Sequence, residues 1–239
     1  MALLLCHSPK GGVGTSFIAA QLSILLAERG HEVTALDFTY QDALKLYFGL
    51  LPAHKLPDMA SHAGEATVVS GVELLSAHEP ARDPAFARRL SEEGGAKPFG
   101  GERIYIADVA AGDRDTKALL FPHALLHICP LHPRPGSLAA LPMVQPGTPT
   151  IELEKTVFVL NHLDDTHRFS RHSHVFLREL VGDRLIGTVR RDEAVNEAAA
   201  MFEPISRFAP NSVALADLVR LAAAVEQRCG IAKTAEAQP

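Results

Sequence analysis

The sequence has few cysteines and no long apolar run, and these two features limit the kinds of protein that it can be. The three cysteines, Cys6, Cys129 and Cys229, are far apart and form no C-x-x-C pair. A disulfide framework or a zinc site is therefore not expected, and a reducing cytoplasm fits. No stretch approaches the roughly 18 apolar residues of a membrane span. The N-terminal run ALLLC is too short for a signal peptide, so we expect a soluble cytoplasmic protein.

An excess of basic charge is also missing. The chain has 23 lysines and arginines against 28 aspartates and glutamates, a formal net charge of −5, which argues against a broad nucleic-acid-binding surface. Its 239 residues, 47% of them hydrophobic, suffice for a sizeable core. We expect a single domain over residues 1–230 and a disordered tail over residues 231–239.

Short apolar runs alternate with helical patterns along the chain. Strands are expected over residues 2–8, 31–38, 71–77, 102–112, 124–132, 155–164 and 183–189. Helices are expected over residues 15–30, 82–95, 171–183, 192–202 and 212–230. Two stretches rich in proline and glycine, 51–64 and 133–150, are expected to be loops. The alternation predicts a doubly wound α/β fold, with a mostly parallel sheet and helices on both of its faces.

A glycine-rich segment, SPKGGVGTS at residues 8–16, separates the first expected strand from the first expected helix. Strand, glycine loop and helix is the arrangement in which backbone N–H groups and a helix N-terminus bind phosphate. The ordinary phosphate-binding loop reads G-x-x-x-x-G-K-[ST], but here Thr15 replaces its lysine and Lys10 precedes the glycines. Ser16 is placed to ligate Mg²⁺ through its hydroxyl, or Thr15 in a looser register. Taken alone, the segment could also be a β-to-α turn without a ligand.

Three polar residues end later strands in a comparable way. Asp37 lies in VTALDF, Asp108 in IYIADVAAG and Asn161 in FVLNHLD. Ligands of open parallel sheets bind at the carboxyl ends of the strands. Each residue alone could be a cap or a turn residue. Together with the glycine loop, the three residues predict one nucleotide-binding crevice.

These motifs together resemble the MinD/ParA superfamily of deviant Walker A proteins, in which a lysine precedes the paired glycines. Lys10 occupies that position, ALDFTYQDALKLYFG resembles the second motif of the family, normally D-x-D, and YIADVAAGD resembles its Walker B strand and switch. The stretches NHLDDTHRFSRHSHVFLRELVGDRL and RRDEAVNEAAAMFEPISRFAPNSVALADL most resemble one branch, the BcsQ proteins of cellulose-synthase operons. That branch typically reads G-G-V-G-T, so Thr15 is itself a point of similarity.

The resemblance implies a role for each matched position, with ATP or ADP and Mg²⁺ as ligands. Lys10 would reach the nucleotide of the partner subunit in a face-to-face dimer, and Lys10 and Asp37 would serve catalysis. Asp108 would hold Mg²⁺ through water, beside Ser16, and Asn161 would read the adenine edge. The phosphates would be cradled by Gly11, Gly12, Val13, Gly14, Thr15 and Ser16. The loop beside the base would be formed by Arg190, Arg191, Asp192 and Glu193.

Two departures from the family pattern bear on hydrolysis. Thr15 replaces the lysine that bridges the β- and γ-phosphates, and Thr39 replaces the second acid of D-x-D, which orients the attacking water in the family. Losing one cation aimed at developing charge costs roughly 3–4 kcal/mol, or on the order of 10²–10³ in rate. Binding should suffer less, because the loop amides, Mg²⁺ and the dimer contacts remain. We expect the loop to hold a nucleotide and to hydrolyse it slowly or not at all.

The resemblance implies a nucleotide-sandwich homodimer that regulates or positions bacterial cellulose synthesis and secretion. Its expected partners are the inner-membrane cellulose synthase complex and associated small regulatory proteins. We expect it in the cytoplasm, peripheral to the inner membrane or at the cell pole, without sequence-specific nucleic acid. The alternative is a ParA/MinD-type partition or positioning ATPase that acts on DNA or another polar cargo. A protein that has lost nucleotide binding altogether is a further alternative.

Four histidines cluster in NHLDDTHRFSRHSH, at positions 162, 167, 172 and 174. An H-x-H pair can chelate a metal, but no carboxylate lies at firm ligand spacing on a predictable element. We therefore favour a polar switch or a partner surface over a metal site. His127 and His132, which flank the run ICP, are expected at strand ends.

Overall fold

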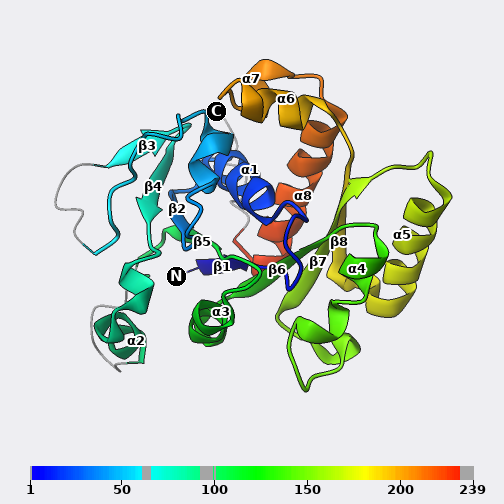
Figure 1. Cartoon of the computed structure of the whole chain (residues 1–239), viewed down its shortest axis with the longest axis horizontal. Coiled ribbons are helices and arrows are strands. Elements are labelled where there is room, and N and C mark those ends of the chain that lie inside the picture. The colour runs from blue at the N-terminus through cyan, green and yellow to red at the C-terminus, as the bar shows by residue number, and fades with distance from the viewer. Residues whose placement is uncertain (1, 61–65, 92–98, 100, 232–239) are drawn as a thin grey trace, which may run out of the picture.

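The computed structural model describes residues 2–60, 66–91, 99 and 101–231, and its eight strands join in one sheet (Figure 1). The strands are β1 (Ala2–Cys6), β2 (Val33–Asp37), β3 (Thr67–Val69), β4 (Val72–Ser76), β5 (Ile104–Asp108), β6 (Leu126–Leu131), β7 (Thr156–Leu163) and β8 (Leu185–Arg190). Their order is β3-β4-β2-β5-β1-β6-β7-β8. The edge strand β3 runs antiparallel to β4, and every other pair is parallel.

Helices cover both faces of the sheet, which confirms the predicted doubly wound α/β fold (Figure 1). The α-helices are α1 (Thr15–Glu28), α2 (Pro84–Ser91), α3 (Arg114–Leu120), α4 (Pro135–Leu138), α5 (Arg168–Val181), α6 (Ala194–Ala200), α7 (Ile205–Phe208) and α8 (Val213–Cys229). The 3₁₀ helices are η1 (Leu44–Phe48), η2 (Pro80–Arg82), η3 (Phe121–His123), η4 (Leu141–Met143), η5 (Thr150–Glu152) and η6 (Gly182–Arg184). In the described part of the chain, no helix is long and apolar enough to cross a bilayer.

The central strand β1 shows why its sequence is apolar throughout. Leu4 points into the core beneath α1 and α8, whereas Leu3 and Leu5 point into the opposite core, which also holds residues of α2 and α3. Side chains alternate between the faces of a strand, so a strand covered on both sides has no polar face. β1 pairs with β5 on one side and with β6 on the other. The chain runs from β1 to β2 on the β5 side and later crosses from β5 to β6 on the opposite side. This reversal of strand order places the phosphate loop at a switch point of the sheet.

The helix that follows the loop is almost entirely embedded. Ten of the 14 residues of α1 are buried, and its sequence TSFIAAQLSILLAE is correspondingly apolar around most of its circumference. Gly30 follows the helix with φ of +87°, the left-handed conformation that glycine adopts without a steric cost. The helix expected over residues 15–30 is therefore observed, and Gly30 follows its last turn.

The structure contains some short elements that the sequence did not predict. The strand β3 and the helix α3 were not expected, and the loop expected over residues 133–150 contains α4 and η4. Asp113 caps α3, because its carboxylate accepts a hydrogen bond from the Thr116 N–H at 3.0 Å. Ile231 is described, whereas residues 232–239 of the predicted tail lie outside the described residues.

Candidate nucleotide-binding site

The glycine loop joins the end of β1 to the start of α1, as the sequence predicts. Gly12 and Gly14 have φ of +75° and +88°, a conformation in which other residues are strained. The first turn of α1 contains no acidic residue, so the helix N-terminus keeps its positive potential for an anion. Lys10, Gly11 and Gly12 are exposed, whereas Val13 is buried. The loop therefore presents its backbone to a ligand and is anchored through Val13.

Asn161 lies behind the loop and fixes its shape. Its Nδ2 donates to the Val13 carbonyl at 2.9 Å, although the two residues are 148 positions apart. A Cβ atom built on Gly14 would lie 2.3 Å from the same Nδ2. Gly14 is thus required both for its φ and for this close approach. Asn161 is 2% exposed, so in this structure its side chain holds the loop, and its contact with the adenine edge stays a prediction.

Asp108 ends β5 next to Asp37, which ends the neighbouring strand β2. Asp108 is 1% exposed, and within the described part of the chain neither of its carboxylate oxygens has a hydrogen-bond partner. Burial and the charge of Asp37 raise the pKa of Asp108 to about 7, whereas the nearby Ser16 hydroxyl lowers it. A buried carboxylate without donors, close to a hydroxyl at the head of a helix, suits a divalent cation.

The described residues contain no ready cluster of three or more His, Cys, Asp or Glu side chains for a metal. A cation at Asp108 and Ser16 would therefore draw most of its ligands from water and phosphate. Mg²⁺ has this preference, because it keeps several waters and binds through few protein groups. The residues present fit Mg²⁺ in this way, and Asp108 would act on it through water, as the resemblance implies.

Asp37 is bonded to the turn that follows it. Its Oδ1 accepts from the Thr39 N–H at 2.7 Å and from the Thr39 hydroxyl at 2.6 Å, and its Oδ2 accepts from the Leu44 N–H at 3.1 Å. Burial raises the pKa of Asp37, and these hydrogen bonds oppose the rise. Lys45, also buried, pairs with Asp42 in the same turn. Thr39 thus occupies the position of the second acid of D-x-D, and its hydroxyl and N–H both donate to Asp37, the first acid.

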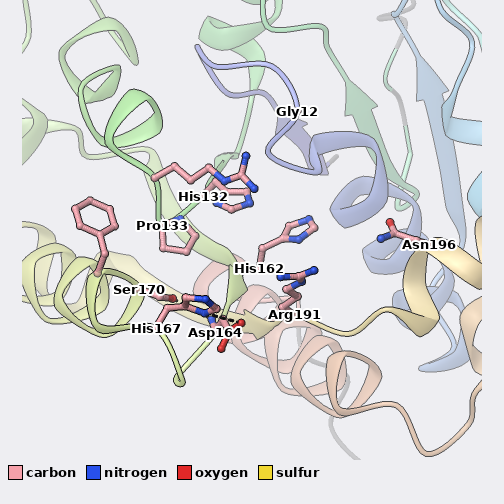
Figure 2. A pocket seen from close by; sticks show the side chains of 11 residues that line it. Gly12, His132, Pro133, His162, Asp164, His167, Ser170, Arg191 and Asn196 are labelled. Carbon is pink, nitrogen blue, oxygen red and sulfur yellow. Dashed lines mark hydrogen bonds and ion pairs between the residues drawn. The ribbon is translucent and has the colours of Figure 1, made fainter.

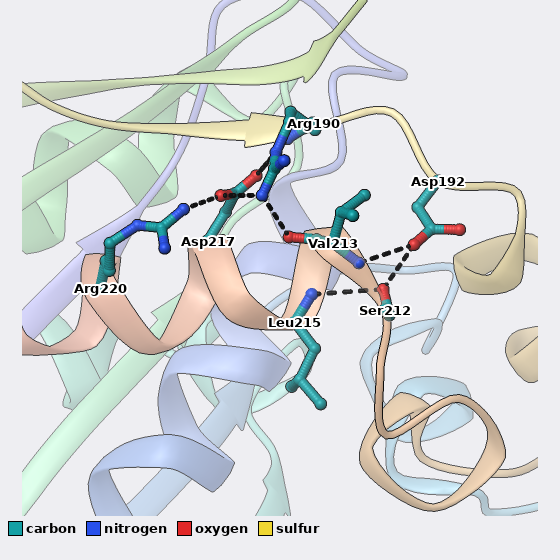
Figure 3. Close-up of polar contacts among 7 residues, drawn as sticks. All are labelled: Arg190, Asp192, Ser212, Val213, Leu215, Asp217 and Arg220. Atoms are coloured by element: carbon teal, nitrogen blue, oxygen red, sulfur yellow. Dashed lines mark hydrogen bonds and ion pairs between the residues drawn. The ribbon is translucent and has the colours of Figure 1, made fainter.

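Figure 3 shows how the segment expected beside the base is tied to α8. The Arg190 guanidinium donates to both oxygens of Asp217, at 2.8 and 2.9 Å, and its backbone N–H donates to Oδ2 at 2.9 Å. Asp192 accepts from the Ser212 hydroxyl at 2.6 Å and from the Val213 N–H at 3.1 Å. These two side chains therefore shape the segment. Of residues 190–193, which were expected beside the base, only Arg191 lines the pocket described next.

A pocket of about 480 Å³ opens beside the loop (Figure 2), within the roughly 300–1,000 Å³ of ligand sites. Its most distinctive feature is a pair of imidazole rings, His132 and His162, stacked at 4.9 Å between centroids and 17° between planes. Burial, then His162, Arg134 and Arg191, lower the pKa of His132 to about 4. The pocket is lined by Gly12, His132, Pro133, Arg134, His162, Asp164, His167, Phe169, Ser170, Arg191 and Asn196.

Several of these pocket residues were not predicted as ligand residues. His132 and Arg134 directly follow β6, so the rule that ligands bind at the carboxyl ends of strands could have found them. Of the four clustered histidines, His162 and His167 line the pocket, and His167 pairs with Asp164 at 2.9 Å. The other two lie on α5, away from the pocket lining.

Comparison with known families shows which family the chain belongs to. Residues 4–205 match the CobQ/CobB/MinD/ParA nucleotide binding domain. The chain belongs to this family. Comparison with curated proteins finds no relative. The family match spans the loop, Asp37, Asp108, Asn161 and the 190–193 segment, so the observed crevice coincides with its nucleotide-binding domain.

Solved structures of MinD and ParA type share the fold of this chain. The MinD protein of Pyrococcus horikoshii, complexed with Mg-ADP, is 19% identical, with a TM-score of 0.69 over 98% of this chain and 99% of that one. A putative plasmid partition protein of Borrelia burgdorferi, bound to AMPPNP, is 16% identical, with a TM-score of 0.71 over 95% and 99%. A chain of the MinC:MinD cell division complex of Aquifex aeolicus is 13% identical, with a TM-score of 0.73 over 100% and 99%.

Lys10, which the resemblance matches to the signature lysine of MinD/ParA proteins, lies on the open side of the loop. Lys10 is exposed, and its Cε lies 4.0 Å from the position of a Cβ built on Gly136, at the start of α4. Among the described residues it has no ion-pair partner. Thr15 begins α1 and is half-buried. Lys10 is therefore the cation that the loop itself offers to a ligand.

Proposed function

We propose that the protein binds ATP or ADP with Mg²⁺ at the glycine loop and keeps the nucleotide with slow or no hydrolysis. The observation that carries this proposal is the buried Asp108 carboxylate, which has no hydrogen-bond partner among the described residues and lies near Ser16. Mg²⁺ would supply the missing counter-charge, and the loop N–H groups would bind phosphate. The Mg-ADP and AMPPNP complexes of proteins with the same fold support this choice of ligand.

Slow hydrolysis follows from the two threonines. Thr15 brings no charge to the phosphates, and the Asp37 oxygens are bonded to Thr39 and Leu44. Phosphoryl transfer depends on positioned charge and on an oriented water. The chain lacks the usual residue for each task, while its means of binding phosphate remain. We therefore assign the site to holding a nucleotide state and not to rapid turnover.

We further propose a face-to-face homodimer that regulates or positions cellulose synthesis at the inner membrane, with the protein on the cytoplasmic side. Support for the dimer comes from the exposed Lys10 on the loop. Support for cellulose comes from the sequence resemblance of residues 161–185 and 190–218 to the BcsQ branch. Deleting the gene in its own bacterium should reduce cellulose secretion, and a Lys10→Ala copy should restore less than the parent. Normal secretion in the deletion strain would refute this role.

The alternative is a partition or positioning ATPase acting on DNA, because a putative plasmid partition protein shares the fold. Binding to random duplex would then weaken steeply with salt as Lys and Arg contacts to phosphate are lost. The net charge of −5 argues against it. Duplex binding at low salt that Mg-ATP stimulates would favour this alternative over the cellulose role.

Nucleotide binding itself is tested with Gly14→Asp. The new carboxylate would clash with the Asn161 amide, because even a Cβ would lie 2.3 Å from Nδ2, and it would repel the phosphates. Equilibrium dialysis with labelled ATP should show binding by the parent and none by the variant, with circular dichroism confirming that both are folded. Equal binding by both would place the nucleotide elsewhere.

A further inference from the structure

The histidine pair in the pocket is held in place by an irregularity of the sheet. The pairing of β7 with β8 shifts in register between Leu160 and Leu163, and His162, within that interval, has φ of +57°. A left-handed backbone is uncommon for a residue other than glycine and is maintained by its surroundings, often at functional sites. Bulges of this kind re-aim a side chain. Here the ring of His162 is directed to the glycine loop.

Contacts on both sides of His162 define its position. Its Nε2 is 4.0 Å from the position of a Cβ on Gly14, and its ring stacks on His132. The Nδ1 of His132 is buried and, among the described residues, has no hydrogen-bond partner. Figure 2 shows His132, His162 and Arg191 coming together on the wall of the pocket. An imidazole pair with an unused nitrogen thus lies beside the backbone that would bind phosphate.

The charged groups that face this pair come from every element around it. Arg134 approaches from the segment after β6, and Arg191 and Glu193 approach from the segment after β8. Asp164 and His167 line the same pocket before α5, and they pair with each other. Cations therefore act on the rings more directly than carboxylates do. Burial lowers the pKa of both rings; the charge of His162 and then the two arginines act on His132, and the two arginines act on His162, so without ligand the neutral form of each ring is favoured.

We propose that His132 and His162 form a proton-accepting part of the nucleotide site, and that binding of the anionic ligand is coupled to uptake of a proton by this pair. The proposal rests on the proposed nucleotide binding and adds its regulation by pH. A phosphate chain at the loop brings negative charge to the rings and offsets Arg134 and Arg191. The protonated form is then favoured in the complex. The pair would act as a proton-linked contact to the ligand and not as a metal site.

The direction of the pH dependence follows from linkage. A group whose pKa is higher in the complex than in the free protein takes up a proton on binding between the two pKa values. Affinity for ATP therefore rises as pH falls across that interval. The dissociation constant should fall up to about tenfold per pH unit for each proton taken up. Above the interval, affinity should no longer change through this pair.

The experiment is isothermal titration of the full chain with Mg-ADP at pH 6, 7 and 8, each in two buffers of different ionisation enthalpy. ADP is used so that hydrolysis plays no part. We expect the dissociation constant to fall from pH 8 to pH 6 and the difference between buffers to report proton uptake. Replacing the rings, with His132→Asn and His162→Asn, should remove most of the uptake. The matched control is His172→Asn, an exposed histidine of α5 outside the pocket lining, which should behave as the parent does.

The outcomes separate this inference from the proposed function. If the parent binds ADP with the same affinity at all three pH values and takes up no proton, the histidine coupling is wrong while nucleotide binding stands. Equal proton uptake in the His132→Asn, His162→Asn and parent proteins would also refute it. If no variant and no pH gives binding, the proposed nucleotide site itself fails. Because the φ of His162 is also accessible to asparagine, His162→Asn keeps the bulge and tests the ring alone.

Discussion

At the scale of single residues, two neighbouring carboxylates have opposite environments. Asp37 accepts three hydrogen bonds from its own turn, whereas Asp108, paired with it across β2 and β5, has none in the described structure. Burial penalises charge on both, but the chain offsets it with three hydrogen bonds at Asp37 and only through the nearby Ser16 hydroxyl at Asp108. A cation bound at the proposed Mg²⁺ site would offset the charge of Asp108.

This difference predicts how stability depends on pH without a ligand. The pKa of Asp108 rises from 3.8 to about 7 on folding, so the folded state binds more protons and stability falls as pH rises through this window. Removing the charge in Asp108→Asn should abolish that loss. Relative to the parent, the variant should gain about 3 kcal/mol in free energy of unfolding between pH 5 and pH 8, because about two units of the shift lie there. Urea unfolding without Mg²⁺ and nucleotide measures it, and parallel pH profiles would contradict the account.

The two threonines predict how hydrolysis could be restored. Thr15→Lys adds a cation at the family position, and Thr39→Asp adds the second acid while removing the hydroxyl bonded to Asp37. The double variant should turn over ATP on the order of 10² times faster than the parent, since each change supplies one missing group. Phosphate release measures this. A parent that already hydrolyses at about 1 s⁻¹, the low end for kinases, would show that neither residue limits the rate.

At the scale of elements, β8 and α8 pack so closely at Gly187 that a side chain there would collide with α8. A Cβ on Gly187 would lie 2.9 Å from Leu221 Cδ1, in a core where close packing leaves little space. Gly187→Ala should lower the free energy of unfolding by about 1–3 kcal/mol through overpacking. When Leu221 is already replaced by alanine, Gly187→Ala should lower the free energy of unfolding by less than it does in the parent. Additive effects in urea unfolding would mean that the two residues do not compete for space.

The sequence was informative for elements whose burial is uniform. Strands such as β1 are covered on both faces and form apolar runs in the sequence. The sequence placed Asp37 and Asp108 at strand ends, and the structure shows that these two ends are neighbours. The sequence did not predict contacts between residues that are far apart along the chain. The bond from Asn161 to Val13, the bond from Arg190 to Asp217 and the left-handed His162 depend on tertiary structure. The helix α3 was missed because seven residues after a turn give too short a periodic pattern.

At the scale of the whole molecule, the proposed role of Lys10 involves a second copy of the chain. Lys10 is exposed on the loop and has no ion-pair partner in the described chain, so a facing subunit can receive its charge in an isologous dimer. Lys10→Ala should remain folded, lose nucleotide-stimulated dimerisation and bind ATP more weakly. Sedimentation of parent and variant, with and without Mg-ATP, checks this, with Lys55→Ala as an exposed-lysine control. Identical sedimentation in every sample would leave Lys10 no role across a dimer.

Calorimetric titration of the protein with ATP, with and without Mg²⁺, would show whether the glycine loop is a Mg²⁺-dependent nucleotide site. We expect binding that Mg²⁺ strengthens, because Asp108 lies near Ser16 at the start of α1. Ser16→Ala should lose that Mg²⁺ dependence. Ser23→Ala, which removes a hydroxyl bonded to the Ala19 carbonyl within the same helix, should retain it. Failure of the parent to bind ATP, or equal Mg²⁺ dependence in Ser16→Ala and the parent, would contradict the account.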